Sequence, residues 1–395
     1  MPNTLRSNLF ISVAASFVLL HVGGLLTGCG APSKKSAAAS IAESPQNSGA
    51  TAAPESLNYS MIQLRDELAT LEPYIYSSLK FENEVSQKFI LEKVQNLARL
   101  SRNLRHSPAV EEKDPTVRHL AGKFSERLER AEFHFSKGRK EFARDYLMSV
   151  KNFCVHCHIG ASGGPNYTAS AVKGEFFKDL RSFDRVEYYL SRREFNAASG
   201  ELAKILKAKY TNQNQPPYLG RAAFLAMQIS VQHLQNKKLA QQVVINIEGN
   251  SSLPLFLRNK AELWKKSLLN WKNESLGSAV EAMTLFDQRV SEVDTFRALP
   301  VILAGLTDSG GGSPQNATLF YVAAKAYQSL DEFAPRDIAE VYFEACIRER
   351  PHSDQARNCY MEYSDSVRGD LDGSFGKVTP PAVRAKLEEL KKLAE

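Results

Sequence analysis

Apolar residues recur at intervals of three and four along most of the chain beyond residue 57, and no segment shows the alternation of a β-strand. The first such run is Met61, Leu64, Leu68, Leu71 and Ile75, which predicts a helix with one inward face. The pattern therefore predicts an all-α protein.

Three more amphipathic helices are predicted before residue 160. They cover about 81–106, about 116–135 and a segment from about 140 to the end of this region. Four such helices with short connections bury their apolar faces against one another, so residues 58–160 are expected to form an antiparallel four-helix bundle. The expected inward residues of these three helices are Phe89, Val94, Leu97, Leu104, Leu120, Phe124, Leu128, Phe135, Phe142, Tyr146, Val150, Phe153 and Cys157.

A Gly- and Ser-containing linker, 161–172, precedes a second helical region at 173–395. Phrases such as "VEYYLSRREFNAASGELAKIL" resemble tetratricopeptide repeats in their small and aromatic residues, although no fixed period of about 34 residues is present. The region is expected to be a solenoid of helical hairpins. Such arrays offer surfaces that bind a peptide or protein partner. A role that only supports the first helical bundle is equally compatible with the sequence.

The N-terminus has the layout of an export signal: Arg6 precedes a short apolar run that ends in "LTGC" at Cys29. These four residues resemble the lipobox of bacterial lipoproteins, which implies cleavage after residue 28 and a lipid on the sulfur of Cys29. Gly30 after the cysteine implies an outer-membrane rather than an inner-membrane location, facing the periplasm. An uncleaved anchor and a signal peptide cut elsewhere are the alternatives. Residues 29–57, rich in Ala, Ser, Pro and Gly, are a predicted flexible tether.

The length and net charge of the chain limit the number of folded units and the kinds of partner. With 395 residues, of which 43% are hydrophobic, the chain is long enough for two folded units. The formal charge of +6 is spread along the chain, so a nucleic-acid partner is not indicated, whereas mildly acidic partners remain compatible.

The chain has five cysteines. Export would place them in an oxidising compartment, where cysteines usually pair or bind a group. Cys346 and Cys359 flank Pro351 in a predicted helical hairpin, at similar distances from its turn, which predicts a disulfide. Two buried thiols that only pack are the alternative.

The remaining two cysteines belong to "CVHCH", residues 154–158, which contains the C-x-x-C-H pattern of c-type haem attachment. Cys154 and Cys157 are spaced to form thioethers with the haem vinyl groups, and His158 is placed to ligate the iron. Zinc is a poorer fit, because four ligands so close on one helix do not converge tetrahedrally. A redox-active C-x-x-C usually accompanies a βαβ pattern, which this sequence lacks.

A helical bundle with C-x-x-C-H near its end resembles the class II cytochromes c, the cytochrome c-prime family. The resemblance covers about residues 58–160. It implies one covalent haem c, with His158 as the proximal iron ligand and a distal face formed by the first helix. Met61 is the candidate distal ligand there; an apolar side chain would leave the iron five-coordinate. Members often pair through the bundle, so a homodimer is compatible, but the family's usual basic residue after the histidine is replaced by Ile159.

Several alternatives to Met61 exist. Met61 fits equally a packing role on the apolar face of its helix. His106, His119 and His134 are alternative sixth ligands, each more typical of a surface or helix-end histidine. Met148 is a poor candidate, because it lies about 15 Å before His158 on the same helix.

The leading functional hypothesis is an envelope cytochrome that transfers electrons to a redox partner protein. The alternatives are a five-coordinate haem protein that binds or senses small gases, and a helical-repeat scaffold with an accessory haem. An enzyme is not favoured, because the sequence has no Gly-rich phosphate loop and no catalytic triad. The charged residues near Met61 are interpreted as a solvated helix face; they are Arg65, Asp66 and Glu67.

Overall fold

In the computed structural model of the protein, helices cover most of the described residues from Leu57 onward. The predicted signal peptide and nearly all of the predicted tether lie outside the described part of the chain. The structure describes residues 57–111, 115–160, 175–178, 180–211, 213–272, 275–308, 314–330, 336–374 and 380–395.

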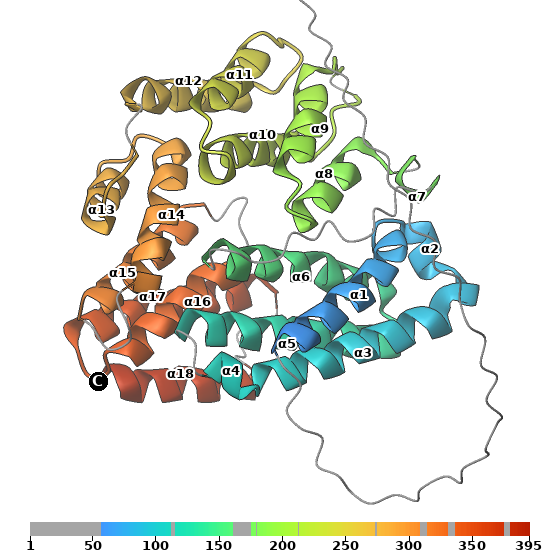
Figure 1. The fold of residues 1–395 in the computed structure, drawn as a ribbon, viewed down its shortest axis with the longest axis vertical. Helices are drawn as coiled ribbons and strands as arrows, with labels where there is room; N and C mark the ends of the chain where they lie inside the picture. Colours follow the sequence, from blue (N-terminus) through green and yellow to red (C-terminus); the bar gives the residue numbers. More distant parts are fainter. Residues whose placement is uncertain are drawn as a thin grey trace, which may run out of the picture. The chain divides into compact units, whose positions relative to one another are not determined.

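The described residues contain only helices and their connections, and no strand, which confirms the prediction of an all-α protein (Figure 1). Consecutive helices pack against each other in pairs. The first half contains α1 (Leu57–Ile75), α2 (Ser78–Glu82), the 3₁₀ turn η1 (Glu84–Ser86), α3 (Gln87–Arg105), α4 (Pro108–Glu111), α5 (Pro115–Ser136), α6 (Lys140–Gly160), α7 (Glu175–Lys178), α8 (Ser182–Ser191) and α9 (Phe195–Lys207). The second half contains α10 (Leu219–Gln228), the π-helical turn η2 (Ile229–His233), α11 (Lys237–Glu248), α12 (Leu255–Asn270), α13 (Ala279–Asp287), α14 (Glu292–Asp308), α15 (Pro314–Gln328), α16 (Arg336–Glu349), α17 (Asp354–Ser374) and α18 (Pro381–Ala394).

Helices α1, α3, α5 and α6 are neighbours in space in the same order as in the sequence. Helix α1 packs on α3, α3 on α5, and α5 on α6, so that each runs antiparallel to its neighbour (Figure 1). Gly138, with φ of 73°, forms the tight turn between α5 and α6 in a backbone region that favours glycine. Arg144, in the first turns of α6, donates a hydrogen bond from Nε to the backbone oxygen of Ile75 at 2.6 Å, which joins α6 to the end of α1.

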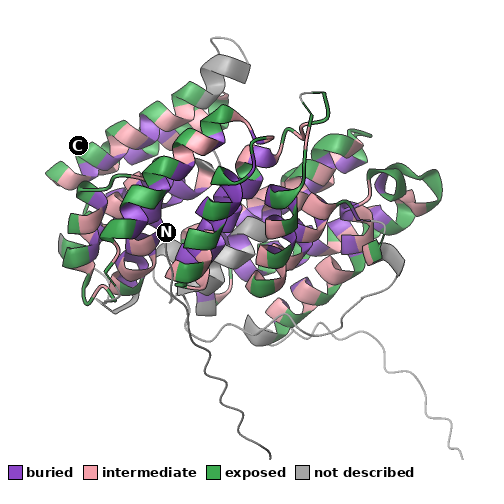
Figure 2. Cartoon of the chain, turned by 90° about the horizontal axis from the view of Figure 1, so that it is seen from above, coloured by how far each residue is buried: buried purple, intermediate pink, exposed green. Residues whose placement is uncertain are grey.

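The apolar face predicted for the first helix is confirmed. Leu64, Leu71 and Ile75 are buried, and Met61 and Leu68 are partly buried against the same hydrophobic cluster. The helix continues through Pro73 to Ile75. Figure 2 shows the general rule in this fold: each helix turns buried positions toward its neighbours and exposed positions outward.

Two of the residues expected to be inward lie elsewhere. Phe142 is 60% exposed, and Phe89 is 37% exposed, packed beside the ring of Tyr74. The buried face of α6 instead begins one position later, with Ala143 and Leu147. Spacing alone could not decide this, because both residues stand at the edge of the apolar face of their helix.

The later helices continue the pairwise packing. Helix α8 packs on α9, α11 on α12, and each helix from α13 to α17 on the next one. One hydrophobic cluster includes residues of α1 to α6 together with residues of α13 to α18, because α16 packs on α5. The predicted boundary between two domains falls between α6 and α7, where residues 161–174 lie outside the described residues, and it stays a prediction.

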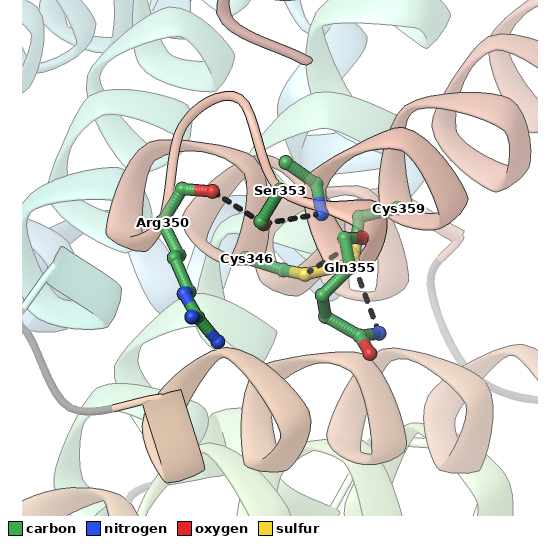
Figure 3. Close-up of a disulfide and its surroundings, with 6 residues drawn as sticks. Cys346, Arg350, Ser353, Gln355 and Cys359 are labelled. Atoms are coloured by element: carbon green, nitrogen blue, oxygen red, sulfur yellow. Dashed lines mark hydrogen bonds between the residues drawn. A yellow bond between two sulfur atoms is a disulfide. The ribbon is translucent and has the colours of Figure 1, made fainter. Parts of the chain in front are cut away.

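A disulfide joins Cys346 of α16 to Cys359 of α17, with Cα atoms 6.3 Å apart (Figure 3). Both residues are fully buried. Ser353 begins α17 by accepting a hydrogen bond from the backbone nitrogen of Ala356 at 3.1 Å. His352 in the turn has φ of 58°, and its backbone nitrogen donates to the oxygen of Leu393 at 2.8 Å, so the hairpin is also tied to α18.

Candidate functional site

The C-x-x-C-H motif lies in the last two turns of α6. The backbone of these turns is helical, whereas the side chains of residues 154–160 lie outside the described residues. Phe153, directly before the motif, is 1% exposed and belongs to the hydrophobic cluster. The turn of α6 that leads into the motif is therefore packed into the core.

Met61 lies near the start of α1, on its inward face. Its side chain is partly buried and packs against the hydrophobic cluster that contains Leu64 and Leu71. The Met61 thioether therefore packs against apolar side chains. This environment fits a packing role and a role as iron ligand equally well.

The hydrogen bond between Arg144 and Ile75 sets the register of α6 against α1. Met61 lies 75 − 61 = 14 residues before Ile75 on α1, and His158 lies 158 − 144 = 14 residues after Arg144 on α6. Because the two helices are antiparallel, both steps lead in the same direction, and each covers about 21 Å. Measured from this contact, Met61 and the backbone of residue 158 are therefore displaced by similar distances along their own helices.

The same step also preserves the face of each helix. Fourteen residues are two heptads, after which an α-helix has returned to within about 40° of its starting direction. Met61 thus shares a face of α1 with Ile75, whose side chain is buried.

The side chain of His119 contacts α16. Its Nδ1 lies 3.6 Å from a carboxylate oxygen of Glu344 in α16. Burial lowers the pKa of His119 to about 4, so the ring is neutral at pH 7. One turn and two turns later, Lys123 pairs with Glu340 and Arg127 with Asp337. His119 belongs to a polar row between α5 and α16.

His134 and His106 also lie in places that differ from the expected haem site. The ring of His134 stacks between Phe142 and Tyr146, with centroids 5.5 Å and 5.4 Å away. Burial lowers its pKa. Tyr146 precedes position 158 by 158 − 146 = 12 residues, about 18 Å along α6, so His134 is at the other end of the helix. His106 is the exposed residue that ends α3.

The charged residues near Met61 pair with one another or with a neighbouring helix. The Nε of Arg65 donates a hydrogen bond to Oδ1 of Asp66 at 2.8 Å. Glu67 forms an ion pair with Lys93 of α3, in which Oε2 and Nζ are 3.0 Å apart. These contacts agree with the expectation of a partly solvated face.

Two buried charge clusters were not anticipated from the sequence. Glu344 is 5% exposed, and burial raises the pKa of its carboxyl. Attraction by His119 and Lys386, together with hydrogen bonds from Lys386 and Arg348, outweighs that effect and lowers the pKa to about 2. Glu72 of α1 pairs with Arg192 at 2.6 Å, and both are buried. The i, i+4 spacing of His119, Lys123 and Arg127 was the available signal for the first cluster.

Elsewhere among the described residues, no group of three or more His, Cys, Asp or Glu side chains is arranged to hold a metal ion. No helix in the described ranges is long and apolar enough to cross a membrane. Cys29 and the residues around it lie outside the described residues.

The chain matches no family model, no curated protein and no solved structure. The likeness to class II cytochromes c therefore rests on the C-x-x-C-H motif and on the order of the helices that precede it.

Proposed function

We propose that the protein is a lipid-anchored c-type cytochrome of the bacterial envelope, with one covalent haem held by the helices α1, α3, α5 and α6. It passes electrons to a partner protein. The observation that carries the proposal is the C-x-x-C-H motif in the last two turns of α6, a helix that contacts α1, the helix of Met61, through Arg144 and Ile75.

The register of α6 supports haem attachment. Leu147 and Val150 are buried on the inward face of α6, and positions 154 and 157 follow them by seven residues each. Residues seven apart on a helix share a face, so the register favours both cysteines on the side of the neighbouring helices. His158 follows on the same side, as an iron ligand requires.

The surroundings of such a haem favour electron transfer. A haem supplies one iron that is oxidised or reduced by one electron. The buried Leu64 and Phe153 keep water from the level of the motif, and His158 with Met61 would fix the iron from both faces. His119, the histidine nearest in level on α5, is directed to Glu344 and does not compete with Met61.

The location of the protein follows from the N-terminal resemblance. Lipid on Cys29 would hold the chain on a membrane, and Gly30 favours the outer membrane. The tether to α1 would leave the helical unit in the periplasm, where c-type haem attachment takes place.

The helices beyond α6 are proposed to support the haem-binding helices and to offer a surface for a protein partner. Their pairwise packing is that of helical-hairpin arrays. The polar row on α5 attaches α16 directly to the haem-binding helices. The proposed limits remain 58–160 for the cytochrome unit and 173–395 for the array.

The test is covalent haem attachment in cells that carry a c-type haem maturation apparatus. The full chain should retain haem after denaturation, and a Cys154→Ala, Cys157→Ala variant should retain none. His156→Gln is the matched control within the motif, since helical rotation takes this position off the face shared by the cysteines, and it should retain haem. A full chain without covalent haem, or a double variant that keeps it, would contradict the proposal.

A further inference from the structure

Two chain connections meet at the end of α1, α3, α5 and α6 that is opposite to the motif. One joins α1 to α3 through α2 and η1; the other is the α5–α6 turn. Phe81 of α2 stacks edge to face with Phe135 at the end of α5, with ring centroids 5.5 Å apart. Together with the Arg144–Ile75 hydrogen bond, this contact holds the two connections at one end of the helices.

Both connections expose large apolar side chains. Leu79 and Val85 in the first are 83% and 91% exposed, and Phe133 and Phe142 beside the second are 52% and 60% exposed. The ring of His134 lies 5.4 Å from that of Phe133 and 5.5 Å from that of Phe142, so the two phenylalanines form one aromatic surface. Single exposed apolar residues are ordinary, but four at one end of a helical unit indicate a binding surface.

Cations accompany the aromatic surface. Lys137 and Arg139 lie in the α5–α6 turn and Lys140 begins α6, and none of the three forms an ion pair with any described residue. The Nζ of Lys137 lies 6.0 Å from the centroid of the Phe133 ring. Glu141 is the nearest acidic residue in sequence, so the turn keeps a net positive charge.

We propose that these two connections bind the surface of an anionic phospholipid bilayer. Exposed Leu, Val and Phe tips that enter the headgroup region, with Lys and Arg beside them, are the pattern of interfacial membrane binding. The positive charge lies on the α5–α6 turn, since the other connection carries exposed Glu82 and Glu84 beside Lys80. The cations of the turn favour a negatively charged occupant, and the protruding apolar tips fit a fluid interface without a shaped groove.

The predicted tether is long enough for this contact. Residues 30–56 number 56 − 30 + 1 = 27, and a flexible chain of that length spans about 29 Å on average. Helix α1, with 19 residues, is about 28 Å long. A chain anchored at Cys29 therefore reaches a bilayer with the far end of α1. The proposal rests on the anchor of the proposed function for its proximity to a bilayer, and it does not depend on the haem.

Tryptophan fluorescence in vesicles tests the contact. Phe133→Trp and Phe142→Trp variants of the lipidated full chain are reconstituted into vesicles of phosphatidylethanolamine and phosphatidylglycerol, with and without brominated acyl chains. The added tryptophan should shift to shorter wavelength and be quenched by bromine. The matched control is Met361→Trp on α17, at a residue that is 57% exposed, and its tryptophan should remain unquenched.

The charge requirement gives a second readout. Quenching should be lost in vesicles of neutral phosphatidylcholine, and also when Lys137, Arg139 and Lys140 are all changed to Gln. Circular dichroism of each variant checks that the helices are retained. The proposal is overturned if the two new tryptophans are quenched no more than the Met361→Trp control, or equally in neutral vesicles. A blue shift without bromine quenching would also overturn it, because the occupant would then be a protein, such as a second copy of the chain. If the chain does not float with the vesicles at all, the proposed lipid anchor is wrong. If it floats but the added tryptophans are not quenched, the anchor stands and the proposed bilayer-binding surface is wrong.

Discussion

The disulfide between Cys346 and Cys359 offers a quantitative test of how the C-terminal hairpin is stabilised. The two residues are 13 apart in sequence, and both are fully buried at the contact of α16 with α17. Changing both to Ala removes the cross-link and leaves side chains that the buried site accommodates. Closing a loop of about 15 residues lowers the entropy of the unfolded chain by an amount worth about 3 kcal/mol.

That loss is a large share of the ordinary stability of a folded protein, about 5–15 kcal/mol. Urea unfolding followed by circular dichroism should show the free energy of unfolding of the Cys346→Ala, Cys359→Ala variant lowered by about 3 kcal/mol. The unsubstituted protein in a reductant should lose a similar amount, whereas the variant should be insensitive to the reductant.

Two results would refute this reasoning. A variant within about 1 kcal/mol of the unsubstituted protein would mean that the cross-link constrains little in the unfolded chain. A variant that a reductant still destabilises would mean that another disulfide carries the effect. The hydrogen bond from the nitrogen of His352 to the oxygen of Leu393 stays in both proteins, so α18 should remain attached.

Three further predictions concern buried side chains. Glu72→Ala should lower the free energy of unfolding by about 3–5 kcal/mol, because it removes the carboxylate paired with buried Arg192. The control is Asp66→Ala, at an exposed ion pair on the same helix, which should lower it by less than about 1 kcal/mol. Equal effects of the two substitutions in urea unfolding would contradict this prediction. Because the folded-state pKa of His119 is about 4, below its ordinary 6.5, stability should be full above pH 6.5 and fall as the pH drops toward 4, by at most about 3 kcal/mol. His119→Gln should flatten that part of the pH profile, and parallel profiles for the two proteins would speak against it. Phe153→Ala should cost about 3–5 kcal/mol in urea unfolding, since the ring is 1% exposed; a cost below 1 kcal/mol would show that the core before the motif is loosely packed.

The sequence predicted those features that depend on neighbouring residues. The inward face of α1 follows from the spacing of its apolar residues. The pairing of Cys346 with Cys359 follows from their positions around one turn. Phe142 was expected inward and is exposed, because periodicity marks an apolar face and leaves its edges undecided.

Contacts between distant segments could not be predicted. Arg127 and Asp337 pair across 210 residues, and Glu72 and Arg192 across 120. No local pattern selects one carboxylate among many for such a partner. The packing of α16 on α5, and with it the orientation of His119, became visible only in the fold.

The measurement that tests the account most directly is the visible spectrum of the haem-loaded protein, in the ferric form and in the ferrous form with and without carbon monoxide. The account predicts a low-spin spectrum of a covalent c-type haem that carbon monoxide leaves unchanged. Met61→Ala should convert it to a high-spin form that binds carbon monoxide, whereas Met148→Ala, at a partly buried methionine of α6, should not. A high-spin ferrous form that binds carbon monoxide in the unsubstituted protein would contradict ligation by Met61 and favour gas binding; a chain that acquires no haem would contradict the account as a whole.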